Sequence, residues 1–380
     1  MLATSQTAAG LEHNPNRFKL GQRSSLDGLR GVATLIVTLS HFGLVRGSVV
    51  GLELLFALSG FLITVLLVEE WERRGAISVP AFYLRRARRI VPPLFAMMAV
   101  VSVVTVALGM RTPGEMLGDC AASGLFLTDG FAVAGFLAPR TMWGQTWSLS
   151  VEMQFYLVWP LVFLLLRRRG GGPKRLTSFL VAAIVVEATA RLVLFINRPS
   201  DPALRIHYLS RLYFPPEMHA DSLLFGCLAG ASLAWNRLPT TARFESRLRA
   251  AGWCSLAFLA YSVCGVHPLL PAYFCGLETL LGASASVVLV WLMRRPPAVL
   301  RGALESGLLS GIGRVSYGLF LFHIPIIHWL EPKTPAAIMF GFALSFACAF
   351  LSYFAVERHF QKRRPPIAAV APAVVSRRAA

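Results

Sequence analysis

The sequence alternates long apolar segments with short segments that are polar or rich in arginine. Ten apolar segments stand out, and each approaches the roughly 20 residues that a helix needs to cross a bilayer. They fall at residues 28–46, 50–68, 90–110, 147–166, 176–196, 218–236, 250–266, 273–293, 311–330 and 336–356. The pattern predicts an all-α integral membrane protein of about ten transmembrane helices, without a separate soluble domain.

The basic residues fall mostly on one side of the predicted spans. With the N-terminus placed in the cytoplasm, 28 of the 37 Lys and Arg residues lie in inner segments, seven in outer segments and two within spans. Such a bias is typical of multi-pass membrane proteins, and it predicts that both termini are cytoplasmic. It also explains how a net charge of +18 coexists with 55% hydrophobic residues. We therefore expect a lipid bilayer around the chain and no nucleic acid partner.

A further stretch, residues 116–138, is only moderately apolar. As a full span it would place Arg167–Arg169 outside and remove the charge bias, so we expect an external loop or a re-entrant helix there. The boundaries that follow are a cytoplasmic N-terminal segment at 1–25, a transmembrane domain at 26–357 and a cytoplasmic basic tail at 358–380. The first segment has no apolar core of a signal peptide, so the first span is expected to start membrane insertion.

The first span carries two ionisable residues, Arg30 near its cytoplasmic end and His41 eleven residues later. On a helix this separation is about 16.5 Å and three turns, so both side chains lie on nearly one face. Ionisable side chains inside a bilayer are costly and usually face an interior cavity. A histidine hydrogen-bonded between helices would explain His41 alone. The arginine on the same face, which can hold an anion, favours a functional site.

Four arginines in five residues, Arg85, Arg86, Arg88 and Arg89, stand at the cytoplasmic boundary before the third span. Such a cluster is by default a topology anchor that contacts lipid phosphates. A polyphosphate clamp is the sharper interpretation, because guanidinium groups bind phosphate with two parallel hydrogen bonds. The sequence leaves both open.

Glu152 lies about a turn and a half into the fourth span, among the aromatic residues Trp147, Tyr156 and Trp159. A carboxyl group at that depth needs a partner or a proton, which makes Glu152 a candidate site residue. A structural hydrogen bond to a neighbouring helix is the alternative. The ninth span similarly carries Tyr317 and His323 in apolar surroundings.

Other charged residues within spans include Glu53, Asp221, Glu278 and the pair Glu187 and Arg191, whose i,i+4 spacing favours mutual neutralisation. A metal site at His219 and Asp221 has weak support, because no established ligand spacing is present. The signatures of P-loop ATPases, dinucleotide-binding enzymes and serine hydrolases are absent from the sequence.

Five motifs together resemble acyltransferase family 3, a family of multi-span membrane enzymes that O-acylate cell-surface sugars and related molecules. The motifs run in the family's order across about 330 residues: LDGLRG with His41, GLELLFALSGFLIT at 51–64, RRARRIVP at 85–92, TWSLSVEMQFYLVWP at 146–160, and SYGLFLFHIP at 316–325 with the closing Glu357. Each motif alone is modest, but the ordered set is specific.

The resemblance implies a ten-helix domain that moves an acyl group from cytoplasmic acyl-coenzyme A to a hydroxyl, often on the outer face. It implies that His41 is the essential catalytic residue and that Arg30 is its partner. Arg86 and Arg89 would contact the acyl donor, and the neighbouring Arg85 is expected to contribute to donor binding. It also matches Glu152 to a family glutamate. The residues expected in supporting positions are Ser148, Tyr317, His323 and Glu53.

The sequence departs from the family at two of these positions. Met153 stands where many relatives carry a second glutamate, and Glu53 stands where an aspartate is frequent. The chain also ends soon after the tenth predicted span, where some relatives continue into an esterase-like domain. We therefore expect no second catalytic step.

The leading hypothesis is an O-acyltransferase, most simply an acetyltransferase, in a bacterial inner membrane. His41 would be the general base, or would itself carry the acyl group as a covalent intermediate. Acyl-CoA is expected as donor substrate with no tightly bound cofactor and no metal, and a saccharide or lipid-linked saccharide as acceptor. A non-catalytic transporter or flippase and a membrane scaffold with a basic inner face are the rival hypotheses. The sequence fixes neither the acceptor nor the acyl group.

Overall fold

The structure, a computed structural model, describes residues 18–21, 23–135, 141–267 and 270–362, and every regular element within them is helical. The N-terminal helices are α1 (Ser24–His41), α2 (Ser48–Arg74), α3 (Val79–Ala107), α4 (Pro113–Gly124), α5 (Thr128–Val133), α6 (Thr146–Arg168), α7 (Pro173–Ile196) and α8 (Pro202–Tyr213). The C-terminal ones are α9 (Ala220–Ala234), α10 (Ala242–Gly265), α11 (Glu278–Arg294), α12 (Ala298–Leu304), α13 (Gly307–Leu330), α14 (Pro335–Ser352) and α15 (Arg358–Lys362). The predicted all-α class is confirmed.

Seven helices are long and apolar enough to cross a membrane: α2, α3, α6, α7, α11 with the π-helical turn Tyr273–Leu277 before it, α13, and α14 continuing through the turn Tyr353–Glu357 into α15. The protein is therefore a multi-pass membrane protein. The other three predicted spans are also helices, namely α1, α9 and α10, but they do not combine the required length and apolarity. The count of about ten crossings stays a prediction.

The ambiguous stretch at 116–138 forms two short helices, α4 and α5, of 12 and 6 residues. Neither reaches the roughly 20 residues of a membrane crossing. Thr112 caps the N-terminus of α4 reciprocally with Glu115, each side chain accepting the other residue's backbone N–H. The stretch is thus not a full span, and its last residues, 136–138, lie outside the described part.

Helix α1 ends at His41, five residues before the predicted end of the span. Gly43 adopts a left-handed conformation with φ of 77°, which residues with a side chain rarely adopt. Its N–H donates to the carbonyl of Ser40 at 3.0 Å, and the N–H of Leu44 donates to Leu39 at 2.9 Å. This Schellman motif stops the helix and places His41 in its last turn rather than deep within a span.

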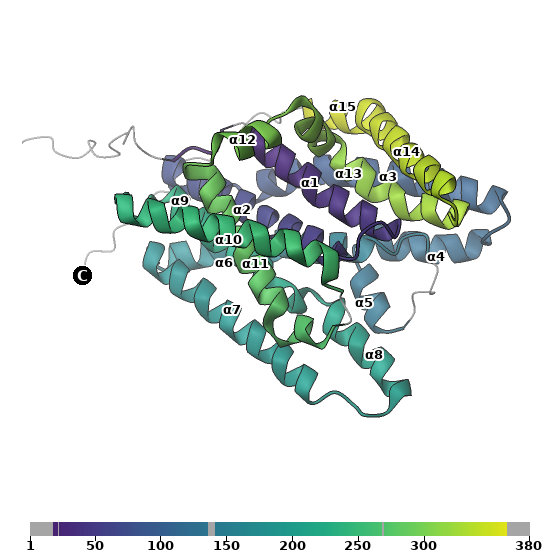
Figure 1. Cartoon of the computed structure of the whole chain (residues 1–380), viewed down its shortest axis with the longest axis horizontal. Coiled ribbons are helices and arrows are strands. Elements are labelled where there is room, and N and C mark those ends of the chain that lie inside the picture. Colours follow the sequence, from purple (N-terminus) through teal and green to yellow (C-terminus); the bar gives the residue numbers. More distant parts are fainter. Residues whose placement is uncertain (1–17, 22, 136–140, 268–269, 363–380) are drawn as a thin grey trace, which may run out of the picture.

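Helices α1 and α13 lie side by side and run parallel (Figure 1). Gly313 allows the close approach, since a Cβ atom there would lie 1.8 Å from the carbonyl oxygen of Asp27. At the other end of the contact, His323 meets His41. Parallel packing agrees with the orientation predicted from the charge bias, in which the first and ninth spans both begin in the cytoplasm.

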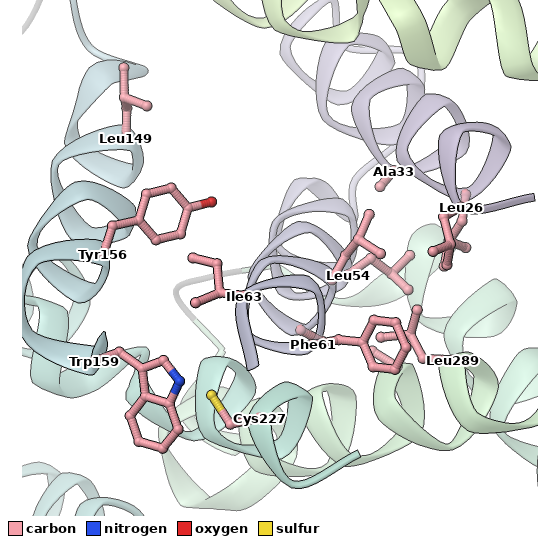
Figure 2. Packing of buried hydrophobic residues seen from close by; sticks show 14 of the residues in the cluster. Leu26, Ala33, Leu54, Phe61, Ile63, Leu149, Tyr156, Trp159, Cys227 and Leu289 are labelled. Atoms are coloured by element: carbon pink, nitrogen blue, oxygen red, sulfur yellow. The ribbon is translucent and has the colours of Figure 1, made fainter. Parts of the chain in front are cut away.

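Helix α2 lies at the centre of the core, and Phe61 and Ile63 on it are fully buried. Figure 2 shows Tyr156 projecting from α6 toward Ile63 of α2, and Trp159 projecting toward Cys227 of α9. The Trp159 indole N–H donates to the Thr64 hydroxyl of α2 at 2.9 Å. This packing fixes α6, and with it Glu152, against α2.

Candidate active site

A cavity with an empty volume of about 840 Å³ lies between α1, α2, α3, α6 and α13. Its polar lining consists of Arg30 and Thr34 of α1, Ser59 of α2, Arg86 and Arg89 of α3, Ser148, Glu152 and Tyr156 of α6, and Ser316 and Tyr317 of α13. Apolar residues, among them Phe320, line the rest. We call this space the inner cavity, because its arginines come from the predicted cytoplasmic ends of α1 and α3.

The arginines of the 85–89 cluster do not all face the inner cavity. Arg86 and Arg89 line it, and the Arg86 guanidinium lies 5.4 Å from the centre of the Tyr156 ring. Arg85 points away and forms a salt bridge with Glu70 of α2 at 3.2 Å. Arg30 lines the cavity from α1 and pairs with Asp27 one turn earlier at 3.1 Å. Of the arginines predicted to bind an anion, the inner cavity therefore gathers Arg30, Arg86 and Arg89.

Glu152 accepts hydrogen bonds from the hydroxyls of Ser59 and Tyr156 within the inner cavity. Tyr156 is itself buried, and its hydroxyl also reaches Ser59 at 3.1 Å. The Tyr156 side chain therefore faces the protein interior. Sequence reasoning missed Ser59, although a polar residue within an apolar span was an available signal.

Two of the four residues predicted in supporting positions, Ser148 and Tyr317, also line the inner cavity. The Tyr317 hydroxyl donates to the carbonyl of Ile90 at 2.9 Å and so joins α13 to α3. The Ser148 hydroxyl donates to the carbonyl of Gln145 at 3.2 Å in the first turn of α6.

His41 lies outside the inner cavity and lines a second one. This outer pocket is formed by His41, Phe42, Gly43, Met110, Arg111, Met142, Ile327, His328, Glu331, Pro332 and Lys333. His41 is exposed to it. Arg30 and His41 thus share a helix but face different cavities. Glu152 lines the inner cavity, as Arg30 does, and it forms its hydrogen bonds there rather than with His41.

His323 lies beside His41 and is fully buried. Its Nε2 atom is 3.1 Å from Nδ1 of His41, and its Nδ1 atom is 2.7 Å from the carbonyl oxygen of Phe320 and 3.2 Å from that of Leu319. Phe320 lines the inner cavity, while His41 lines the outer pocket. The histidine pair therefore lies between the two spaces, one helical turn from the inner one.

Arg111, at the rim of the outer pocket, is held by an acidic residue of α4. Asp119 pairs with it at 3.2 Å and accepts a hydrogen bond from Thr141 at 3.0 Å. Burial raises the pKa of Asp119 above its ordinary value, and the hydrogen bond from Thr141 and the charge of Arg111 act against that shift. Helix α4 thereby helps to shape the pocket that His41 faces.

A buried ion-pair network lies near one end of α2, α7, α9 and α11. Arg191 contacts Glu187 at 2.7 Å, as its spacing predicted, and it also contacts Asp221 at 2.8 Å and Glu278 at 3.1 Å. Sequence spacing reveals only the partner on the same helix. The ion pairs of Arg191 therefore join three helices, α7, α9 and α11, around one cation.

Glu53 belongs to this network rather than to the inner cavity. It accepts a hydrogen bond from Tyr273 at 2.8 Å, and His219 Nδ1 lies 3.3 Å from it and 2.8 Å from Glu278. One potential ligand atom from each of Glu53, His219 and Glu278 lies within 4.8 Å of the other two, so the three residues form a candidate metal cluster. However, 2.8 Å is a direct hydrogen-bond distance, shorter than the roughly 3.3 Å between ligands of a tetrahedral zinc ion. The geometry is that of an ion pair.

The fold described above is that of a multi-pass membrane protein, and comparison with known proteins gives its class. The chain belongs to acyltransferase family 3, because residues 23–356 match that family, described as an acyltransferase domain. The predicted enzyme class, an acyltransferase for groups other than aminoacyl groups, is confirmed by this match together with the relatives.

The chain is 29% identical over 355 residues to the peptidoglycan O-acetyltransferase OatA of Listeria monocytogenes, a match covering 89% of this chain and 56% of that protein. It is 26% identical over 317 residues to the putative peptidoglycan O-acetyltransferase YrhL of Bacillus subtilis, with coverage of 80% and 48%. It is 23% identical over 358 residues to O-acetyltransferase OatA of Staphylococcus aureus, with coverage of 89% and 57%. The chain thus spans about half the length of these relatives. No solved structure matches it.

Proposed function

We propose that this chain transfers an acyl group, most simply acetyl, from cytoplasmic acyl-coenzyme A to a hydroxyl of a cell-wall saccharide outside a bacterial inner membrane. The observation that carries the proposal is the placement of the His41–His323 pair between an arginine-lined inner cavity and the outer pocket that His41 lines. The relatives are peptidoglycan O-acetyltransferases by name, which supports a polymer or its lipid-linked precursor as acceptor.

The inner cavity suits the anionic donor. Coenzyme A carries several phosphate charges, and guanidinium groups bind phosphate with paired, charge-assisted hydrogen bonds. No salt bridge engages Arg86 or Arg89 among the described residues, whereas Arg85 is occupied by Glu70. The apolar part of the lining, from Leu62 to Phe320, would accommodate the uncharged arm that carries the thioester.

The chemistry assigned to His41 is general base catalysis. The imidazole removes the proton of the acceptor hydroxyl, the oxygen attacks the thioester carbonyl, and the bond from carbon to sulfur breaks when the tetrahedral intermediate collapses. The protonated imidazole then returns the proton to the leaving thiolate. The transient oxyanion needs positive charge or N–H donors near the thioester. Arg30 lies about 16.5 Å along α1 from His41, so the role proposed for it is to hold a donor phosphate in the inner cavity.

The test is to incubate the purified protein with acetyl-CoA and a soluble peptidoglycan fragment, and to measure both free thiol and the acetylated fragment. We expect acceptor-dependent thiol release by the wild-type protein, and none by His41→Ala at equal yield and thermal stability. Full activity of His41→Ala would refute the role of that residue. Absence of thiol release with any hydroxyl acceptor would instead favour the transporter hypothesis.

A further inference from the structure

The hydrogen bonds of the histidine pair determine where its protons lie. A carbonyl oxygen only accepts hydrogen bonds, so His323 Nδ1, which faces the carbonyls of Phe320 and Leu319 at 2.7 and 3.2 Å, must carry a proton. In a neutral imidazole the other nitrogen then bears a lone pair. His323 Nε2 is therefore an acceptor, and its partner at 3.1 Å, His41 Nδ1, must be the donor.

This assignment fixes the tautomer of His41. Because its proton resides on Nδ1, the lone pair of the ring lies on Nε2, away from His323. His41 is exposed to the outer pocket, whereas His323 is fully buried, so only one nitrogen of the pair is available to a hydroxyl group. Fixing the tautomer through a hydrogen bond to the other ring nitrogen is a known way in which proteins prepare a histidine base.

From this geometry we infer that His323 is a positioning residue, which holds His41 in the Nδ1–H tautomer and presents its Nε2 atom to the acceptor hydroxyl. The inference rests on the proposed function and deepens it. In the reaction, the hydroxyl proton moves to His41 Nε2 while the oxygen bonds to the acyl carbon. The resulting imidazolium keeps its Nδ1–H bond to His323, whose own N–H points to a backbone carbonyl. The proton finally passes from Nε2 to the thiolate.

The alternative protonation would prevent catalysis. An imidazolium at His323 would donate from Nε2 to His41 Nδ1, and the proton of neutral His41 would then lie on Nε2, where the base is needed. The groups that face His323 are the Phe320 ring, two carbonyls and His41. The charged or titratable groups around His41 line the outer pocket: Arg111, His328, Glu331 and Lys333. No carboxylate contacts His323 among the described residues, and a buried cation without a counter-ion is costly.

The experiment compares His323→Gln with His323→Leu. The amide oxygen of Gln can take the place of Nε2 as acceptor, whereas Leu fills similar space without an acceptor. We expect kcat to fall about 100-fold for His323→Leu, within the range attributed to general base catalysis, with little change in KM for donor or acceptor. For His323→Gln we expect kcat within several-fold of wild type.

A matched control on the same helix is Trp329→Phe, which removes another interhelical hydrogen bond of α13, from the Trp329 indole to Thr105 at 2.9 Å. It should leave kcat unchanged. Wild-type kcat in His323→Leu, or equal loss in the Gln and Leu variants at equal thermal stability, would overturn the positioning role. Failure of the proposed function is distinguishable, because His41→Ala would then remain active.

Discussion

At the scale of single residues, adjacent arginines of α3 have different surroundings. The Arg86 guanidinium lies over Tyr156 in the inner cavity, and the Arg85 guanidinium pairs with Glu70 outside it. Successive residues of a helix point about 100° apart, so a run of arginines cannot all face one cavity. Most of the donor affinity contributed by the 85–89 cluster should therefore come from Arg86 and Arg89.

This difference gives a matched pair of variants. Losing one hydrogen bond to a charged group costs about 1.5–3 kcal/mol, which corresponds to about 10- to 100-fold weaker binding. We expect Arg86→Ala to raise KM for acetyl-CoA by about that factor, and Arg85→Ala to change it less than threefold. Steady-state kinetics with varied acetyl-CoA measure both. Equal effects of the two variants would show that the cluster acts as a general electrostatic or lipid-binding patch.

His41 shows what can be predicted for a single residue and what cannot. Its importance was indicated by an ionisable side chain in an apolar segment and by the family motifs. Its actual neighbour, His323, lies 282 residues away in the sequence, and no local spacing connects the two. Helix geometry predicts that Arg30 and His41 share one face of α1. The two side chains nevertheless line different cavities, because they lie about 16.5 Å apart along the helix axis.

At the scale of helices, the closest contacts depend on glycine. Gly313 touches the backbone of α1, where an added Cβ atom would lie 1.8 Å from the Asp27 carbonyl oxygen. On the same helix, a Cβ atom at Gly311 would meet only the Arg314 guanidinium, at 3.7 Å. Alanine is favoured over glycine within a helix by about 1 kcal/mol where space permits. The two positions should therefore respond in opposite directions.

Gly313→Ala is expected to lower the thermal unfolding temperature in detergent by several degrees and to reduce kcat, because α13 must move away from α1 and carries His323 with it. Gly311→Ala should leave both quantities unchanged or raise the unfolding temperature slightly. The comparison is made by thermal unfolding and acyl transfer assays on the same preparations. A stable, fully active Gly313→Ala would contradict the close packing of α1 and α13.

Helix positions were largely predictable from the sequence, because hydropathy is a local property. The end of α1 was not captured by hydropathy, which continues to residue 46, although Gly43 is a recognised helix-termination signal. No pattern in the sequence predicted that α1 packs against α13, because this contact depends on which glycines meet the backbone of a neighbouring helix. The same holds for the network around Arg191, where only Glu187 lies on its own helix.

At the scale of the whole molecule, the orientation in the membrane decides which cavity meets the cytoplasm. The charge bias places Lys174, at the start of α7, inside, and Lys333, after α13, outside. Both side chains are exposed. With the six native cysteines replaced, a membrane-impermeant maleimide added to intact spheroplasts should label Lys333→Cys and spare Lys174→Cys until the cells are broken. Reversed labelling would invert the assignment of donor and acceptor sides.

The most direct test of the account is vectorial acyl transfer. Right-side-out membrane vesicles are loaded with radiolabelled acetyl-CoA, and a peptidoglycan fragment is supplied only outside. We predict labelled fragment in the external medium with the wild-type protein and none with His41→Ala. Product that forms only when acetyl-CoA is supplied on the same outer side as the fragment would contradict the arrangement of an inner donor cavity, an intervening histidine pair and an outer acceptor pocket.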